Sequence, residues 1–167
     1  EAKALAFDVT FSEFSRYGVS DDQFLGQTIS QFGRFAGVVP LDRSDQNDTS
    51  WPADLRAPKV TVAGLKQWLA LPEARNNVVY QKAIFQIPEV SENAAMLCNI
   101  QQDPDPDKIY RRIKIMGLFD GKVFPQLGIG TYLAANPAES LRIERKWLWV
   151  GEQAIPIDPQ GNVILRY

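Results

Sequence analysis

Short apolar runs separated by polar turns dominate the chain, and their periodicity predicts both strands and helices. Residues 4–9 form an apolar run that contains Asp8, which is typical of a buried strand with a carboxylate at its carboxyl end. Ser20, followed by two aspartates, is a typical capping residue at a helix start. The less polar positions of this helix recur at helical spacing until Gly33: Phe24, Leu25, Thr28, Ile29 and Phe32.

A second apolar run, at residues 35–41, follows this helix. A strand, a helix and a strand in this order predict a parallel pair joined by a right-handed crossover. Residues 42–58 are polar and irregular, which predicts a surface loop that is buried only around Trp51 and Leu55. Residues 78–87 mix apolar and polar positions and are interpreted as a strand.

The second half of the chain contains several turn signals. Pro88 predicts the start of a helix over residues 88–97, which is followed by a strand at 98–102. The Asp-Pro repeat at 103–107 predicts a loop, because proline has no N–H group for a strand ladder. Residues 110–119 alternate like a half-buried strand, and the Asp-Gly pair that follows them predicts a tight hairpin. The remaining predictions are a helix over 125–136 and strands at 141–144, 147–150, 154–157 and 163–167.

These elements predict one domain over residues 1–167, of mixed α/β class. We expect a central β-sheet with strand-helix-strand crossover units and a C-terminal antiparallel meander. A chain of 167 residues can bury a core of its own, and Cys98, the single cysteine, forms no internal disulfide. The chain begins at Glu1 without a methionine or a leader, as an excised fragment of a longer protein would.

Composition narrows the possible chemistry. The sequence contains no histidine, which excludes Ser-His-Asp and Cys-His catalytic systems and histidine-bearing zinc sites within these residues. The formal net charge of -2 argues against a dedicated nucleic-acid partner. No run of 18 or more apolar residues is present in the sequence, so the segment itself contains no predicted membrane span. We predict no cofactor and no metal.

Asp8 is the first candidate for chemistry. Its place after an apolar strand is similar to that of the aspartyl nucleophile of haloacid dehalogenase-type phosphatases, which use an Asp-x-Asp-x-Thr motif. The sequence lacks the second aspartate, because Thr10 occupies that position. Hydrogen bonding at a strand end is the simpler interpretation of Asp8.

The aspartates of the Asp-Pro repeat are a second candidate. Asp103, Asp105 and Asp107 occupy the first, third and fifth positions of a possible hard-cation loop. Lys108 and Lys114 stand where such a loop needs a glycine and a glutamate, which favours a solvated, proline-stiffened turn. Basic residues lie nearby and in a later hairpin, where they could hold an anion or protect sheet edges. They are Arg111, Arg112, Lys114, Arg142, Arg145 and Lys146.

Several short motifs follow one another in order. Residues 4–13 end in Phe-Asp-Val-Thr-Phe-Ser-Glu, and residues 21–25 read Asp-Asp-Gln-Phe-Leu. Residues 87–100 begin with Ile-Pro-Glu and contain Asn99, and residues 103–112 run from an aspartate to Arg112. Residues 155–161 read Ile-Pro-Ile-Asp-Pro-Gln-Gly, and the last six residues of the chain follow them. In this order and spacing the motifs resemble those of the CHASE2 family, the extracytoplasmic sensory domain of bacterial transmembrane receptors.

The resemblance implies a non-enzymatic sensor outside the cytoplasmic membrane. The full protein would add membrane segments and an output module, such as an adenylate or guanylate cyclase, a histidine kinase or a Ser/Thr kinase. The expected partners are a small-molecule or protein stimulus and a second copy of the receptor. A ligand would act by binding one arrangement of the domain better than another. The candidate ligand-binding residues are Asp8, Glu13, Asn99, Asp103, Asp105 and Arg112.

Two alternatives belong to other functional classes. One is a Mg²⁺-dependent, phosphatase-like enzyme with Asp8 as the reactive carboxylate and Asp103 or Asp105 as a metal ligand. The other is a structural dimerisation module whose open sheet edge pairs between protomers.

Overall fold

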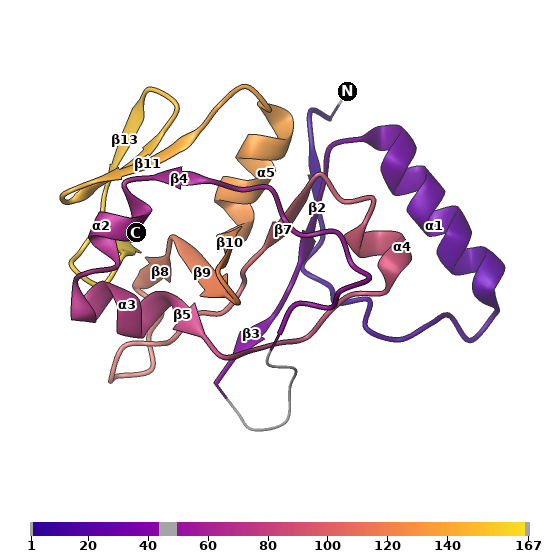
Figure 1. Ribbon diagram of the computed structural model, residues 1–167, viewed down its shortest axis with the longest axis horizontal. Helices are drawn as coiled ribbons and strands as arrows, with labels where there is room; N and C mark the ends of the chain where they lie inside the picture. The colour runs from indigo at the N-terminus through magenta and orange to yellow at the C-terminus, as the bar shows by residue number, and fades with distance from the viewer. Residues whose placement is uncertain (1, 44–49, 166–167) are drawn as a thin grey trace.

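A computed structural model describes residues 2–43 and 50–165, in which the strands form five small sheets and none of the sheets is closed (Figure 1). The described residues are 24% helical and 28% strand, which confirms the mixed α/β class. The strands are thus divided among several sheets, while the prediction had one central sheet.

The first sheet confirms the predicted parallel pair of strands with a helix between them in the chain. Its strands β1 (Leu5–Ala6), β2 (Phe35–Val38) and β7 (Met96–Cys98) are all parallel, in the order β1-β2-β7. Helix α1 (Val19–Phe32) connects β1 to β2 and lies at one end of the molecule in Figure 1. Helix α5 (Leu127–Ala135) packs on β2 and β7.

Two details of the first crossover unit differ from the predictions. The predicted buried strand at 4–9 is only two residues long, and Leu5 is 42% exposed. Helix α1 starts after Gly18 and not after Ser20, and its buried residues are Asp22, Gly26 and Ile29. Phe24, expected on the buried face, is 72% exposed.

Close packing explains which face of α1 is buried. An ideal Cβ atom at Gly26 would lie 2.8 Å from the carbonyl oxygen of Glu89, a residue of helix α4 (Pro88–Ser91). A glycine therefore allows the two helix backbones to approach each other, and this contact selects the buried face over the larger apolar residues. The predicted helix at 88–97 ends early, because residues 96–98 belong to β7.

The predicted hairpin is confirmed. Strands β9 (Met116–Phe119) and β10 (Lys122–Pro125) are antiparallel and are joined by Asp120 and Gly121, with positive φ angles of 47° and 70°. Two positive φ angles in a two-residue loop match the twist of the flanking strands. Strand β5 (Val79–Tyr80) pairs with the other edge of β9.

The predicted strand at 110–119 is divided into two. Strand β8 (Arg112–Lys114) pairs with β14 (Asn162–Ile164), whereas β9 pairs with the hairpin partner. The break falls at Ile115, whose amide donates to the carbonyl oxygen of Gly161 at 3.1 Å. The division brings a segment near the end of the chain against β8.

The C-terminal meander is confirmed for three of its four predicted strands. Strands β11 (Leu141–Glu144), β12 (Trp147–Val150) and β13 (Gln153–Pro156) are antiparallel neighbours, and β4 (Val62–Ala63) adds to β11 in parallel. Strand β14 pairs with β8 and does not belong to this sheet, so the prediction of a fourth meander strand is wrong. Residues 166 and 167, the end of that predicted strand, lie outside the described residues.

The remaining elements are short. Strands β3 (Leu41–Asp42) and β6 (Lys82–Ala83) pair with each other, so the predicted strand at 78–87 consists of β5 and β6. Helices α2 (Leu65–Trp68) and α3 (Pro72–Val78) precede β5. Trp51 packs on Phe85 and Phe124 with ring centroids 5.3 and 5.7 Å apart, and Leu55 is buried, as expected for the long loop. Residues 44–49 of that loop lie outside the described residues.

Candidate functional site

Three of the six predicted site residues lie together around a cleft of about 200 Å³. Asp103, Asp105 and Arg112 contribute to its lining, with Lys114 at the end of β8. Two prolines of the Asp-Pro repeat and four amide side chains complete the lining: Pro104, Pro106, Asn77, Gln102, Gln160 and Asn162.

The first wall of the cleft is the predicted proline-stiffened loop. The amide of Asp105 donates to the carbonyl oxygen of Ile109 at 3.0 Å, and the amide of Lys108 donates back to the carbonyl oxygen of Asp105 at 2.7 Å. Lys108 has a positive φ of 65°, which closes this turn. The Asp107 carboxylate accepts the amide of Ile109 at 3.2 Å. The loop is therefore held by its own hydrogen bonds.

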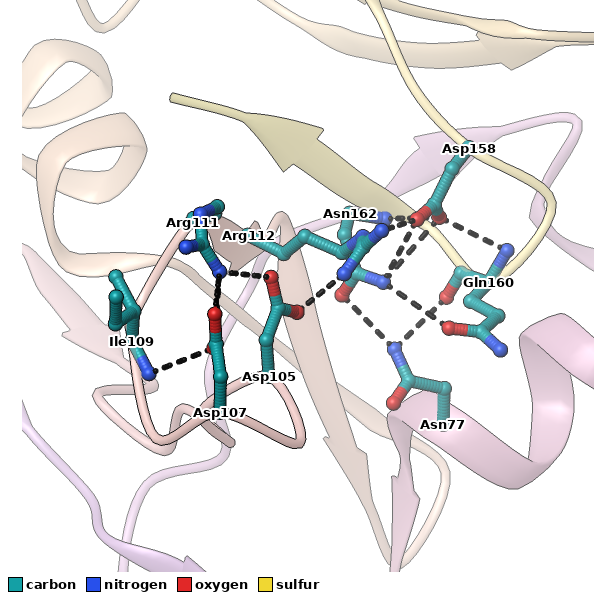
Figure 2. Close-up of polar contacts among 9 residues, drawn as sticks. All are labelled: Asn77, Asp105, Asp107, Ile109, Arg111, Arg112, Asp158, Gln160 and Asn162. Carbon is teal, nitrogen blue, oxygen red and sulfur yellow. Dashed lines mark hydrogen bonds and ion pairs between the residues drawn. The ribbon is translucent and has the colours of Figure 1, made fainter. Parts of the chain in front are cut away.

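Two arginines on the following strand segment fix the carboxylates of the loop. Arg111 forms ion pairs with Asp107 at 2.7 Å and with Asp105 at 3.4 Å, and Arg112 pairs with Asp105 as well (Figure 2). The Arg111 guanidinium lowers the pKa of the Asp107 carboxyl below its usual value. These pairs tie the loop to the start of β8.

The second wall is the turn between β13 and β14. Oδ1 of Asp158 accepts the backbone amides of Gln160 at 3.0 Å and Asn162 at 2.8 Å, and Oδ2 accepts Nδ2 of Asn162 at 3.0 Å. Nδ2 of Asn77, from α3, donates to Oδ1 of Asn162 at 3.1 Å and to the Gln160 carbonyl oxygen at 3.0 Å. One aspartate and two asparagines therefore hold the turn against α3 (Figure 2).

Arg112 joins the two walls. Its guanidinium pairs with Asp105 of the loop, and its Nε lies 3.8 Å from Oδ2 of Asp158 in the turn. The Arg112 side chain is 44% exposed, so water and solutes reach it. A ligand that binds this guanidinium would compete with both carboxylates.

The inner end of the cleft contains a buried cation. The Lys114 side chain is only 4% exposed, and its ammonium pairs with the half-exposed Asp103 carboxylate. The hydrogen bond from Lys114 is the main reason why the pKa of Asp103 is lowered. The ammonium also lies 5.8 Å from the ring centroid of Tyr80, whose pKa is raised to about 12 by burial.

Gln102 lines the cleft next to Lys114. Its Oε1 accepts the backbone amide of Lys114 at 2.8 Å, which fixes the side-chain amide. Its Nε2 is buried and has no hydrogen-bond partner among the described residues.

The other predicted residues do not line this cleft. Asp8 and Glu13 are exposed on the segment that joins β1 to α1. Asn99 is completely buried directly after β7. Its backbone amide donates to the Pro125 carbonyl oxygen at 2.8 Å, and its side-chain Oδ1 accepts the backbone amide of Gln101 at 2.9 Å. These contacts give Asn99 a structural role at the end of β7.

The structure gives no support to a metal at the aspartate loop. Asp103, Asp105 and Asp107 all form ion pairs with a lysine or an arginine, so a cation would have to displace those partners. Among residues 2–43 and 50–165, no group of three or more histidine, cysteine, aspartate or glutamate side chains could hold a metal ion. The basic residues of the later hairpin lie in the β11–β12 sheet and not beside β8.

The sequence reasoning missed the amide side chains of the cleft. Asn77, Gln102 and the pair Gln160 and Asn162 belong to three separate places in the chain and have no motif of their own. The Asp-x-x-Gly signal at residues 158–161 identified the turn that carries two of them, although it indicated no site there.

The whole chain, residues 1–167, matches the model of the CHASE2 domain. The chain belongs to the CHASE2 family. CHASE2 is an extracellular sensory domain family found in receptors, and it is a sensor and not a catalytic domain. No significant match was found among curated proteins or among solved structures. In the described part of this CHASE2 domain, no helix is both long and apolar enough to span a membrane.

The chemistry of the cleft suits recognition in this CHASE2 domain. Its lining has two carboxylates, Asp103 and Asp105, and two cations, Arg112 and Lys114, so its formal charge is balanced. Amide groups supply further donors and acceptors. Asp8 is not among the lining residues, so the cleft does not assemble the carboxylate set of the phosphatase-like alternative.

Proposed function

We propose that this CHASE2 domain is the ligand-recognition part of a bacterial transmembrane signalling protein, and that the cleft around Arg112 binds a small polar molecule. The observation that supports this site is the bridging position of Arg112, between the Asp103–Asp107 loop and the Asp158–Asn162 turn. We further propose an extracytoplasmic, periplasmic location and a cyclase or kinase output, which the family resemblance suggests.

The arrangement suggests how binding could change the domain. A ligand with a carboxylate or hydroxyl group would take over donors of Arg112 that now serve Asp105 and Asp158. The loop and the turn would then lose this side-chain link, and the turn leads directly into β14, which pairs with β8. A ligand that favours the separated arrangement shifts the population toward it by its difference in affinity.

A homodimer is part of this proposal. A receptor that passes a signal through a membrane needs two arrangements of its protomers that a ligand can distinguish. A protein stimulus is the second candidate for the ligand, because the cleft is open and its Arg112 is partly exposed. The structural dimerisation module remains the alternative if no ligand binds.

Calorimetric titration of the purified domain with a panel of free amino acids and monosaccharides tests the site. We expect at least one compound to bind, and we expect Arg112→Gln to weaken its binding at least tenfold. Arg142→Gln is a matched control, because Arg142 is 46% exposed and pairs with a carboxylate, Glu144, in another sheet. Binding that both variants retain, or no binding of any compound in the panel, would contradict the proposed site.

A further inference from the structure

A groove that is lined by other residues has a different character from the cleft. It consists of two adjoining hollows of about 650 and 580 Å³ that share four lining residues: Leu69, Ala70, Arg75 and Val79. We refer to the two adjoining hollows together as the groove. Helices α2 and α3 and strand β5, which contribute to it, lie close together in Figure 1.

The floor of the groove is apolar. The hollow nearer the hairpin is lined by side chains of β4, α2 and β9: Val62, Leu65 and Leu118. Leu69 and Val79 continue this surface into the other hollow, and both are only partly buried. Apolar surface that stays accessible in a groove of this size is typical of a binding site for an apolar group.

The charged residues of the groove are all cations. Arg43, Lys66 and Arg75 are among the described residues that line the two hollows, and no described aspartate or glutamate lines them. Nη2 of Arg43 donates to the carbonyl oxygens of Asn76 at 2.9 Å and Asn77 at 3.0 Å, which fixes this guanidinium at the end of α3. Within the described residues, neither Lys66 nor Arg75 has an ion-pair partner.

The nearest acidic group of the hairpin is already engaged. Asp120 precedes Gly121, a lining residue, and its carboxylate pairs with Lys122 at 3.0 Å and accepts the amide of Trp51 at 3.0 Å. These two contacts lower the pKa of Asp120, so it stays ionised and bonded to them. It is therefore not a counter-ion for Arg75.

We propose that this groove binds a single-chain anionic amphiphile, a long-chain carboxylate. The acyl chain would lie on Leu65, Leu69 and Val79, and the carboxylate would accept hydrogen bonds from Arg75 at the point where the two hollows meet. The charge complementarity favours an anion, since the described lining of the groove contains three cations and no carboxylate. This excludes cationic amphiphiles and gives no specific site to an uncharged alkyl chain.

This site is independent of the proposed function. The polar ligand of the cleft needs Arg112 and amide groups, whereas the amphiphile needs an apolar floor and Arg75, and no residue lines both the cleft and the groove. The domain could therefore respond to two classes of ligand, one polar and one apolar.

Calorimetric titration with monomeric dodecanoate tests the proposal. Dodecan-1-ol and dodecyltrimethylammonium serve as uncharged and cationic controls of the same chain length. We expect dodecanoate to bind at least tenfold more tightly than either control, and Arg75→Gln to remove about tenfold of its affinity, because a charge-assisted contact is lost. Lys59→Gln, an exposed lysine outside the groove, and Arg112→Gln, in the cleft, should leave the affinity unchanged.

Four results would overturn the proposal. The first is no binding of dodecanoate, and the second is equal binding of dodecanoate and dodecan-1-ol. The third is an affinity for dodecanoate that Arg75→Gln does not change while the variant keeps the melting temperature of the parent. Binding to vesicles of anionic phospholipid without binding of monomeric dodecanoate also contradicts it, because the groove would then face a membrane surface. A loss of polar-ligand binding at the cleft has no effect on these outcomes.

Discussion

The ion pair between Lys114 and Asp103 allows a sharp test of the electrostatics of the cleft. The Lys114 side chain is 4% exposed and the Asp103 side chain 55% exposed, so one partner is desolvated and the other is in contact with water. Asp103→Asn would leave the ammonium buried without its carboxylate partner. A cation–π contact with the Tyr80 ring, whose centroid is 5.8 Å away, would remain. We therefore expect the variant to unfold more easily.

The expected magnitude lies between two limits. Removing one partner of a fully buried pair costs about 3–5 kcal/mol, and an exposed pair contributes about 0–1 kcal/mol. Because water screens the Asp103 side, we expect a loss of about 2 kcal/mol, or roughly 4–8 °C in melting temperature for a domain of this size. Urea unfolding followed by tryptophan fluorescence measures the loss as a lower midpoint at an unchanged slope.

A double-mutant cycle separates the pair from other effects. Lys114→Met keeps most of the apolar stem of the side chain and removes the charge, so Asp103→Asn should cost much less in that background. Asp107→Asn is the matched control, because Asp107 is 51% exposed and its partner Arg111 is 42% exposed. The reasoning is refuted if Asp103→Asn costs no more than Asp107→Asn, or costs the same with and without Lys114.

The same pair makes stability depend on pH in a defined direction. The folded-state pKa of Asp103 lies below its ordinary value, mainly because Lys114 donates a hydrogen bond to it. The stabilisation is therefore present above the unfolded pKa of about 3.9 and is lost as the pH falls through the folded pKa. The difference in stability between the parent and Asp103→Asn should be smaller near pH 3 than near pH 6, and an equal difference would contradict the assignment.

Three further predictions concern packing, the turn and the thiol. Gly130→Ala would place a Cβ atom 2.2 Å from Sγ of Cys98, so we expect urea unfolding to show a loss of about 1–3 kcal/mol, which Cys98→Ala should partly restore. Asn162→Ala should lower the free energy of unfolding by about 1–3 kcal/mol in the same measurement, because Asn162 is buried and its removal takes a hydrogen-bond partner from both Asn77 and Asp158. Burial raises the pKa of the Cys98 thiol to about 12, so iodoacetamide near pH 8 should label unfolded but not native protein, and rapid native labelling would be inconsistent with this burial.

The elements that the sequence predicted well are those with local causes. The Asp120-Gly121 hairpin depends on two residues that accept positive φ, and the β11–β13 meander depends on short turns between neighbours. The crossover from β1 through α1 to β2 follows from a helix placed between two strands. Each of these predictions needs only a contiguous stretch of chain.

The candidate site was predicted in part. Asp103, Asp105 and Arg112 were chosen from a motif in one segment, and the structure places all three at one cleft. Asp8 and Glu13 were chosen in the same way, but they are exposed beside α1 and away from the lining of the cleft. A motif thus identified the loop that forms one wall of the cleft. The turn that forms the opposite wall lies about 50 positions later in the chain.

What the sequence by itself determined is the set of local elements, the absence of histidine chemistry and the charged loop at residues 103–107. Only the tertiary structure decided that β14 leaves the meander for β8, that Gly26 and not Phe24 faces α4, and that Asn77 meets Asn162. The physical reason is that strand pairing and side-chain contact between distant segments depend on how whole elements fill the core. Local periodicity sets which residues can face inward, and packing selects the partners that they meet.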